Sequence, residues 1–317
     1  MNFVLVGDDF PAAQTLKLLR DFDVRVLLAF SSPQPERSAK VKSLAEAGKI
    51  PFYSSDLLKG PAGLALLSSR PFDWLININS TVLLPQAALG LPRAGALNMH
   101  PGLLPEYAGL HTHQWALRNG ETEFGATIHF MEPKVDVGDI VLQRRFPIEP
   151  GDTGMSLFYK CIREGTLGMR DVVQKILADE PLPRTPQDLS RYHLYRHRDA
   201  LDGRIDWRWP AGQVERFVRA GNYAPFVSPT YTAHLDPLPG VVIEVLKVTP
   251  AAAPGKAAPG SVFVNDTDKP PLVACGAGEA VRLEQTRLRG GTKLLTPAEL
   301  QQLIASGTRL PGREDAP

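Results

Sequence analysis

The first thirty residues alternate a short apolar run, a helical pattern and a second apolar run, and this order constrains the fold most. Residues 3–6 are apolar and end at Gly7, residues 12–22 carry apolar side chains at helical spacing, and residues 24–30 are apolar again. Two strands joined by a helix are parallel and linked by a right-handed crossover. No Gly-x-Gly-x-x-Gly follows the first strand, which argues against NAD binding. The sequence therefore predicts an α/β, Rossmann-like and mostly parallel sheet.

Polar side chains gather where a later strand ends. Asn98 and His100 stand two residues apart, so on a strand they point the same way. Pro101, Gly102 and Pro105 follow at once and predict a rigid loop. Because ligands of open α/β sheets bind at strand ends, Asn98 and His100 are candidate site residues.

A carboxylate is expected close to this pair. Asp136 lies between two strand-like runs, 126–131 and 140–146, which bring it to His100 if they pair beside the Asn98 strand. An amide that donates to an oxyanion, an imidazole that moves a proton and a carboxylate that sets its charge suit acyl transfer. Each residue alone is compatible with an ordinary structural role. His129, on the first of these runs, is expected to be a core or wall residue rather than a catalytic one.

Four motifs resemble the folate-dependent formyltransferases, which include methionyl-tRNA, glycinamide ribonucleotide and amino-sugar formyltransferases. They occur in the order and spacing of that family and are Asn98-x-His100-Pro101, Leu103-Leu104-Pro105-x-Tyr107-x-Gly109, Trp115-Ala116-x-x-Asn119-Gly120-Glu121 and Asp136-x-Gly138-Asp139-Ile140. The resemblance covers nearly the whole chain and is strongest up to about residue 165. It implies a 10-formyltetrahydrofolate donor as co-substrate and an amine acceptor.

The resemblance also implies site residues. Asn98, His100 and Asp136 are the expected catalytic residues, with direct attack of a neutral amine on the formyl carbon. Asn98 and a protonated His100 would stabilise the oxyanion, while Asp136 would favour the imidazolium and help move the amine proton. The expected donor-binding residues are Thr81, Val82, Leu83, Val135 and Asp136.

Two departures from the methionyl-tRNA enzymes favour a small-molecule amine, such as an amino-sugar nucleotide or an aminoacyl group, and make tRNA the less favoured acceptor. The loop near residues 31–37 is short and lacks a run of Arg, Lys and Gly, and residues 221–226 lack an Asn-Pro-x-Pro-Gly type turn. Tyr107, His111 and His113 are then the expected acceptor-binding residues. A methionyl-tRNA formyltransferase is the alternative. A formyltetrahydrofolate hydrolase and a non-catalytic folate- or nucleotide-binding protein are alternatives of other classes.

Length, charge and cysteine content indicate the number of domains, the kind of partner and the cellular compartment. The 317 residues fit two domains, and 35 basic against 34 acidic residues give no global electrostatic footprint for nucleic acid. Cys161 and Cys275 match no metal or redox spacing, which favours a reduced, cytoplasmic protein without a metal. The start resembles a strand rather than a signal peptide, and no apolar run reaches the length of a membrane span. A homodimer is one option for assembly.

The second half of the chain changes character. Prolines and aromatic-basic residues over 181–204 predict a linker, and short strands spaced by Gly, Pro and Asp predict a small β-barrel-like domain. The predicted organisation is a catalytic domain over 1–180, a linker over 181–204, a C-terminal domain over 205–310 and a disordered tail over 311–317.

Overall fold

The computed structural model describes residues 1–199, 202–264, 266, 268–305 and 307–312. The chain forms two compact units. The first contains residues 1–112, 123–147 and 159–195, and the second contains 113–122, 148–158 and 196–317. The predicted domain boundaries remain a prediction, and most of the predicted tail, residues 313–317, lies outside the described residues.

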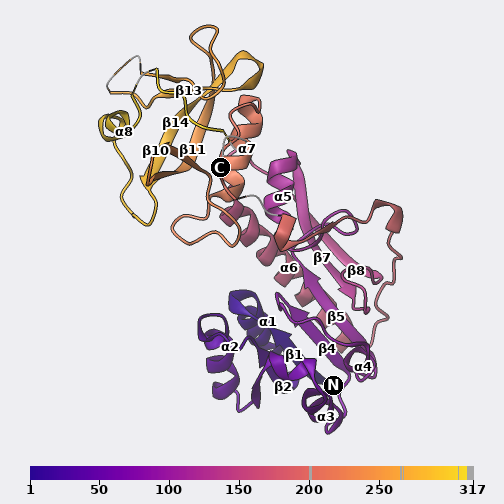
Figure 1. Cartoon of the computed structure of the whole chain (residues 1–317). Helices are drawn as coiled ribbons and strands as arrows, with labels where there is room; N and C mark the ends of the chain where they lie inside the picture. Colours follow the sequence, from indigo (N-terminus) through magenta and orange to yellow (C-terminus); the bar gives the residue numbers. More distant parts are fainter. Residues whose placement is uncertain (200–201, 265, 267, 306, 313–317) are drawn as a thin grey trace. The chain divides into compact units, whose positions relative to one another are not determined.

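A seven-stranded sheet organises the first unit (Figure 1). Its order is β3-β2-β1-β4-β5-β7-β8, so the chain winds outward from β1 in one direction and then returns to continue from β4 in the other. The first five strands in this order are parallel, and β7 and β8 are antiparallel to their neighbours. The strands are β1 (Asn2–Gly7), β2 (Arg25–Ser31), β3 (Phe52–Ser54), β4 (Trp74–Ile78), β5 (Gly95–His100), β7 (Glu123–Phe130) and β8 (Ile140–Pro147). The predicted α/β class and mostly parallel sheet are confirmed.

The parallel strands are buried, as expected for a sheet that helices cover. All five residues of β4 are buried, as are the last five of β1. Helices α1 and α2 pack on each other next to β1 and β2 (Figure 1). Helix α2 begins at Pro35, because proline suits the first turn of a helix. The helices that follow strands in this part of the chain are α1 (Asp9–Asp21), α2 (Pro35–Ala47), α3 (Pro61–Ser68) and α4 (Gln86–Leu89).

Two helices flank the antiparallel strands β7 and β8 in the chain. Helix α5 (Thr112–Asn119) precedes β7, and helix α6 (Gly154–Leu177) follows β8. Thr153 and Ser156 cap α6 reciprocally, since each backbone N–H donates to the hydroxyl of the other. After α6, strand β9 (Leu194–Tyr195) pairs in parallel with β6 (Ala108–Gly109).

The second unit contains an antiparallel sheet of order β10-β11-β14-β13-β12. Its elements are α7 (Ala211–Gly221), β10 (His234–Leu238), β11 (Val241–Ala252), β12 (Val262–Phe263), β13 (Leu272–Ala274), β14 (Glu279–Leu288) and α8 (Pro297–Leu303). Its core joins side chains of α7, such as Phe217, to the buried faces of β11 and β14. The small C-terminal β domain predicted from short strands is confirmed, and its sheet is antiparallel. Strand β11 runs on to Ala252, because residues 251 and 252 pair with β14.

No helix in the described part of the chain combines the length and the apolar character that crossing a membrane requires.

Candidate active site

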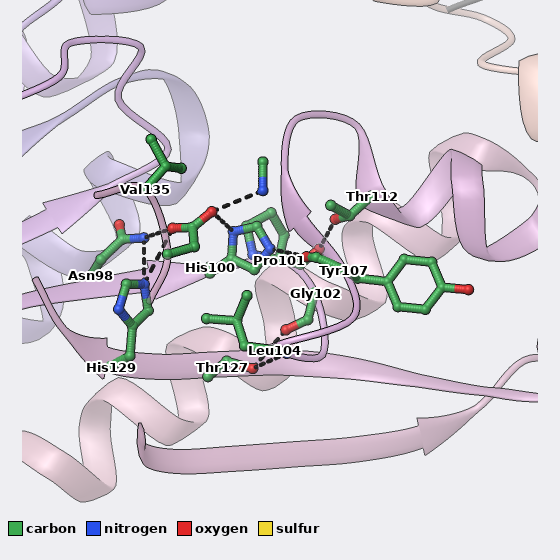
Figure 2. A network of polar contacts seen from close by, with 12 residues as sticks. Asn98, His100, Pro101, Gly102, Leu104, Tyr107, Thr112, Thr127, His129 and Val135 are labelled. Carbon is green, nitrogen blue, oxygen red and sulfur yellow. Dashed lines mark hydrogen bonds and ion pairs between the residues drawn. The ribbon is translucent and has the colours of Figure 1, made fainter. Parts of the chain in front are cut away.

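Three neighbouring strands place polar side chains in one row across the sheet. In the strand register, Asn98 of β5 lies opposite Asn77 of β4 on one side and opposite His129 of β7 on the other. Asn77 Nδ2 donates to Asn98 Oδ1 at 2.9 Å, and Asn98 Nδ2 lies 3.1 Å from His129 Nε2. Because its oxygen accepts from Asn77, the Asn98 amide turns its NH₂ group towards His129 (Figure 2).

The Asp136 carboxylate meets this row from the loop between β7 and β8. Its Oδ1 lies 3.4 Å from Asn98 Nδ2 and 3.3 Å from His129 Nε2, and its Oδ2 lies 3.4 Å from His100 Nδ1. The backbone N–H of Gly109 also donates to Oδ2, at 2.9 Å. Asp136 has a φ of 54°, a left-handed conformation that Asp tolerates better than most residues. The structure thus brings together Asn98, His100 and Asp136, as the sequence predicted.

His100 is enclosed, with a relative exposure of 4%. Its Nε2 lies 2.6 Å from the carbonyl oxygen of Tyr107, so Nε2 carries a hydrogen and donates it. Its other nitrogen, Nδ1, faces Asp136. A second proton on the ring can therefore bind only at Nδ1, the nitrogen that faces the Asp136 carboxylate.

Burial and charge act in opposite directions on this pair. Burial is the strongest influence on His100 and lowers its pKa, although the charge of Asp136 and the Tyr107 carbonyl act to raise it. Burial raises the pKa of Asp136, but His100, His129 and the Gly109 N–H outweigh burial and hold that pKa well below its usual range. The site in this state therefore pairs an ionised carboxylate with a ring that resists protonation.

The segment predicted to bind the donor lies in the loop after β4. Val82 is buried, whereas Thr81 is exposed and Leu83 is 74% exposed. No described residue offers a backbone hydrogen-bond partner to the N–H or C=O of Thr81 and Leu83. These groups are therefore open to a ligand or to solvent, and donor binding by Thr81, Val82 and Leu83 remains a prediction.

Two of the three residues predicted to bind the acceptor, Tyr107 and His113, are buried. Tyr107 is buried at 8% exposure, with its ring stacked on Tyr195 and edge-on to Phe124. His113 belongs to the second unit, is 4% exposed and contacts Tyr223 through its Nε2. His111 is partly exposed and has a φ of 56°. Acceptor binding by these three residues remains a prediction.

Sequence reasoning missed Asn77 and gave His129 only a wall position, yet both lie in the polar row. A signal for Asn77 was present, since it is a polar residue within the apolar strand Trp74–Ile78. A buried amide is costly without hydrogen bonds, so such a residue needs a partner on a neighbouring strand. The partner itself depends on strand register. Within the described residues, no group of three or more His, Cys, Asp or Glu side chains is arranged to hold a metal ion.

Comparison with known proteins identifies the family. Residues 37–173 match the formyl transferase family model, and residues 199–301 match the model of the formyl transferase C-terminal domain. The chain belongs to the formyl transferase family. It is thus a formyltransferase of the folate-dependent family, whose co-substrate is a formyl-tetrahydrofolate, and the predicted resemblance is confirmed.

Its relatives among curated proteins share about a third of its residues. The methionyl-tRNA formyltransferase of Burkholderia ambifaria is 33% identical over 291 residues, covering 92% of this chain and 83% of its own. The methionyl-tRNA formyltransferase of Pseudomonas entomophila is 34% identical over 307 residues, covering 93% of both chains.

Solved structures share the fold of this formyltransferase. An N-formyltransferase from Helicobacter canadensis, in complex with folinic acid and dTDP-3-aminofucose, has a TM-score of 0.66 at 14% identity, covering 89% of this chain and 98% of its own. A sugar 3N-formyl transferase has a TM-score of 0.68 at 13% identity, covering 92% and 99%. At such identities the likeness shows the fold alone.

Proposed function

We propose that this protein transfers the formyl group of 10-formyltetrahydrofolate to an amine nitrogen. The observation that carries the proposal is the convergence of Asn98, His100 and Asp136 at one end of β5 in a member of the formyl transferase family. An amide donor, a proton acceptor and a carboxylate are the groups that acyl transfer to an amine requires. The reaction needs no protein nucleophile, because the amine attacks directly.

The three side chains have separate tasks. As the amine nitrogen bonds to the formyl carbon, the carbonyl electrons move to oxygen, and Asn98 Nδ2 donates to the oxyanion. The amine proton passes to Nδ1 of His100, where the Asp136 carboxylate stabilises the imidazolium. That proton then goes to N10 of the folate as the bond between carbon and N10 breaks. The lowered pKa of His100 suits a ring that begins the cycle neutral, which modifies the expectation of a ring protonated from the start.

The donor occupies the loop after β4 in this proposal. Thr81, Val82 and Leu83 bind its heterocycle chiefly through backbone groups, and Val135 and Asp136 lie on the loop that faces the reacting carbon. The support is that the backbone groups of Thr81 and Leu83 have no hydrogen-bond partner in the described part of the chain.

For the acceptor we propose the α-amino group of methionyl-tRNA. Support comes from the curated relatives, which are named methionyl-tRNA formyltransferases and match along 92–93% of this chain. The comparisons thus favour the alternative of the sequence analysis over its main interpretation.

A small-molecule amine is the second candidate, and the connection between β2 and α2 favours it. This connection is only Ser32–Gln34, where a longer basic loop is expected of a tRNA enzyme. Tyr107, His111 and His113 would then lie at or near the acceptor. Hydrolysis of the donor to formate uses the same three groups with water in place of the amine.

The test is formation of tetrahydrofolate from 10-formyltetrahydrofolate, followed by absorbance, with each acceptor offered separately. We expect turnover with methionyl-tRNA and none in Asp136→Ala, which serves as the control. Turnover with an amino-sugar nucleotide or another small amine, but not with tRNA, would establish the second candidate. Formate release at the full rate without any acceptor would identify a hydrolase and contradict the proposal.

A further inference from the structure

The segment 185–195, hereafter the strap, crosses both loops that form the candidate active site. It lies after α6, which ends at Leu177, and belongs to the first unit. Its first residue, Thr185, forms an antiparallel bridge with Ile140 at the start of β8. Its last residues form β9 against β6. Between these two attachments it contacts the loop of Asp136.

One strap side chain holds the backbone that follows the Asp136 Cα. Gln187 Nε2 donates to the carbonyl oxygen of Asp136 at 3.1 Å and to that of Gly138 at 2.7 Å. The same loop is held one residue earlier, because Tyr192 Oη donates to the carbonyl oxygen of Val135 at 2.9 Å. Asp136 keeps a left-handed φ of 54° between these contacts. Such a backbone conformation persists only where its surroundings fix it.

The strap also fixes the backbone N–H of Gly109, which donates a hydrogen bond to the Asp136 carboxylate. Residues Ala108 and Gly109 pair with Leu194 and Tyr195, and the Leu110 N–H donates to the Tyr195 carbonyl at 2.9 Å. Gly109 has a φ of 92°, and a Cβ there would lie 2.2 Å from the Tyr195 carbonyl oxygen. Only glycine allows this close approach, and it brings the Gly109 N–H to Asp136 Oδ2. Both partners of the contact between Gly109 and Asp136 are thus attached to the strap.

We infer that the strap is part of the active site and that Gln187 is a positioning residue, which acts through Asp136 without touching the substrates. The inference rests on the proposed function for its catalytic consequence. Gln187 has the size and the donors to span two carbonyl groups of one turn. His100 on β5 and His129 on β7 are held by the sheet, so the carboxylate can keep its distance from both rings only if its own loop is fixed.

The distances around Asp136 predict how loss of the Gln187 contacts affects turnover. Asp136 lies 3.4 Å from His100 and 3.3 Å from His129, and a displacement of about 1 Å in a catalytic group can cost about 100-fold in rate. Loss of the Gln187 contacts frees the loop of Val135 and Asp136 but leaves the loop after β4, where the donor heterocycle binds in this proposal, unchanged. The turnover number should therefore fall while the KM of either substrate changes little.

The experiment compares Gln187→Leu with Gln301→Leu. Gln301 is a matched control, because its Nε2 also donates to two backbone carbonyls, those of Asp266 and Lys269 at 2.9 Å each, in the second unit. We expect Gln187→Leu to lower kcat by about 10- to 100-fold with little change in KM, and Gln301→Leu to keep wild-type kcat.

Hydrogen exchange supplies a readout that needs no turnover. The Gly109 amide should exchange faster in Gln187→Leu than in wild type, because its acceptor Asp136 is no longer fixed, while amides of the central strand β4 keep their protection. Unchanged kcat in Gln187→Leu, equal losses in the two variants, or unchanged exchange at Gly109 would overturn the inference. Absence of turnover in the wild type would refute the proposed function instead, and exchange at Gly109 alone would then decide whether the strap fixes Asp136.

Discussion

Two kinds of support meet at the candidate site, and they differ in how firmly they hold their side chains. Asn98, His100 and His129 stand on β5 and β7, whose backbones are fixed by ladders of hydrogen bonds on both sides. Asp136 stands on a loop with a left-handed residue and depends on contacts from outside the sheet. The groups on the strands are therefore positioned by the sheet, whereas the carboxylate is positioned by a later segment of the chain.

The largest loss of turnover is expected for Asp136, the group that stands on a loop. Asp136→Asn keeps the size of the side chain and an oxygen for the Gly109 N–H, but removes the charge that stabilises a proton on His100. We expect kcat to fall by about 1,000-fold, within the range for lost acid–base catalysis. The measurement is steady-state turnover of 10-formyltetrahydrofolate with an unchanged melting temperature as control. A loss smaller than about tenfold would show that the carboxylate is not needed for proton transfer.

A smaller loss is expected on the strand-borne side. Asn98→Ala removes the amide that donates to the oxyanion and leaves β5 paired on both sides. We expect kcat to fall by about 100-fold, as for a single lost oxyanion donor. Near-normal turnover by a folded variant would contradict the role of Asn98. Circular dichroism checks that the variant is folded.

The support of Asn98 should matter less than Asn98 itself. Asn77→Val removes the hydrogen bond that fixes Asn98 Oδ1 and leaves the amide held only through its Nδ2, so we expect turnover to fall about tenfold, the equivalent of about 1.4 kcal/mol. The melting temperature should not fall, because valine suits a central strand and Asn77 Oδ1 is a buried oxygen without a hydrogen-bond partner among the described residues. Parallel losses of activity and stability would mean that Asn77 is only a packing residue.

The smallest effect is expected in the pH dependence of folding stability. Burial lowers the pKa of His100 in the folded chain, so below its ordinary value of 6.5 the unfolded chain binds a proton that the folded chain excludes. The stabilisation is complete above that pH and is lost as the pH falls, so the melting temperature should decrease between pH 7.5 and pH 5.5. His100→Gln should weaken this dependence.

A histidine of the second unit provides the control. Burial also lowers the pKa of His234, so His234→Gln should weaken the same dependence for the second unit rather than the first. Calorimetric scans at several pH values test both variants. A slope unaffected by either substitution would show that other groups set the dependence. Asp136, with its lowered pKa, contributes only under strongly acidic conditions.

Much of the fold followed from local patterns. The apolar runs 3–6 and 24–30 lie within one residue of the bounds of β1 and β2, because full burial leaves a continuous apolar signature. The short pairings were missed. Strands β6 and β9 have two residues each and lie far apart in sequence, so no periodicity marks them.

An amide, an imidazole and a carboxylate in a strand–loop order predict an acyl-transfer set from local patterns alone, because few long-range contacts are needed to recognise it. The groups that hold these side chains follow only from the three-dimensional fold. The register of three strands aligned Asn77, Asn98 and His129, and the path of the strap placed Gln187 on the carbonyls of Asp136 and Gly138. Such partners are separated by tens of residues, and their meeting depends on packing that no local pattern encodes.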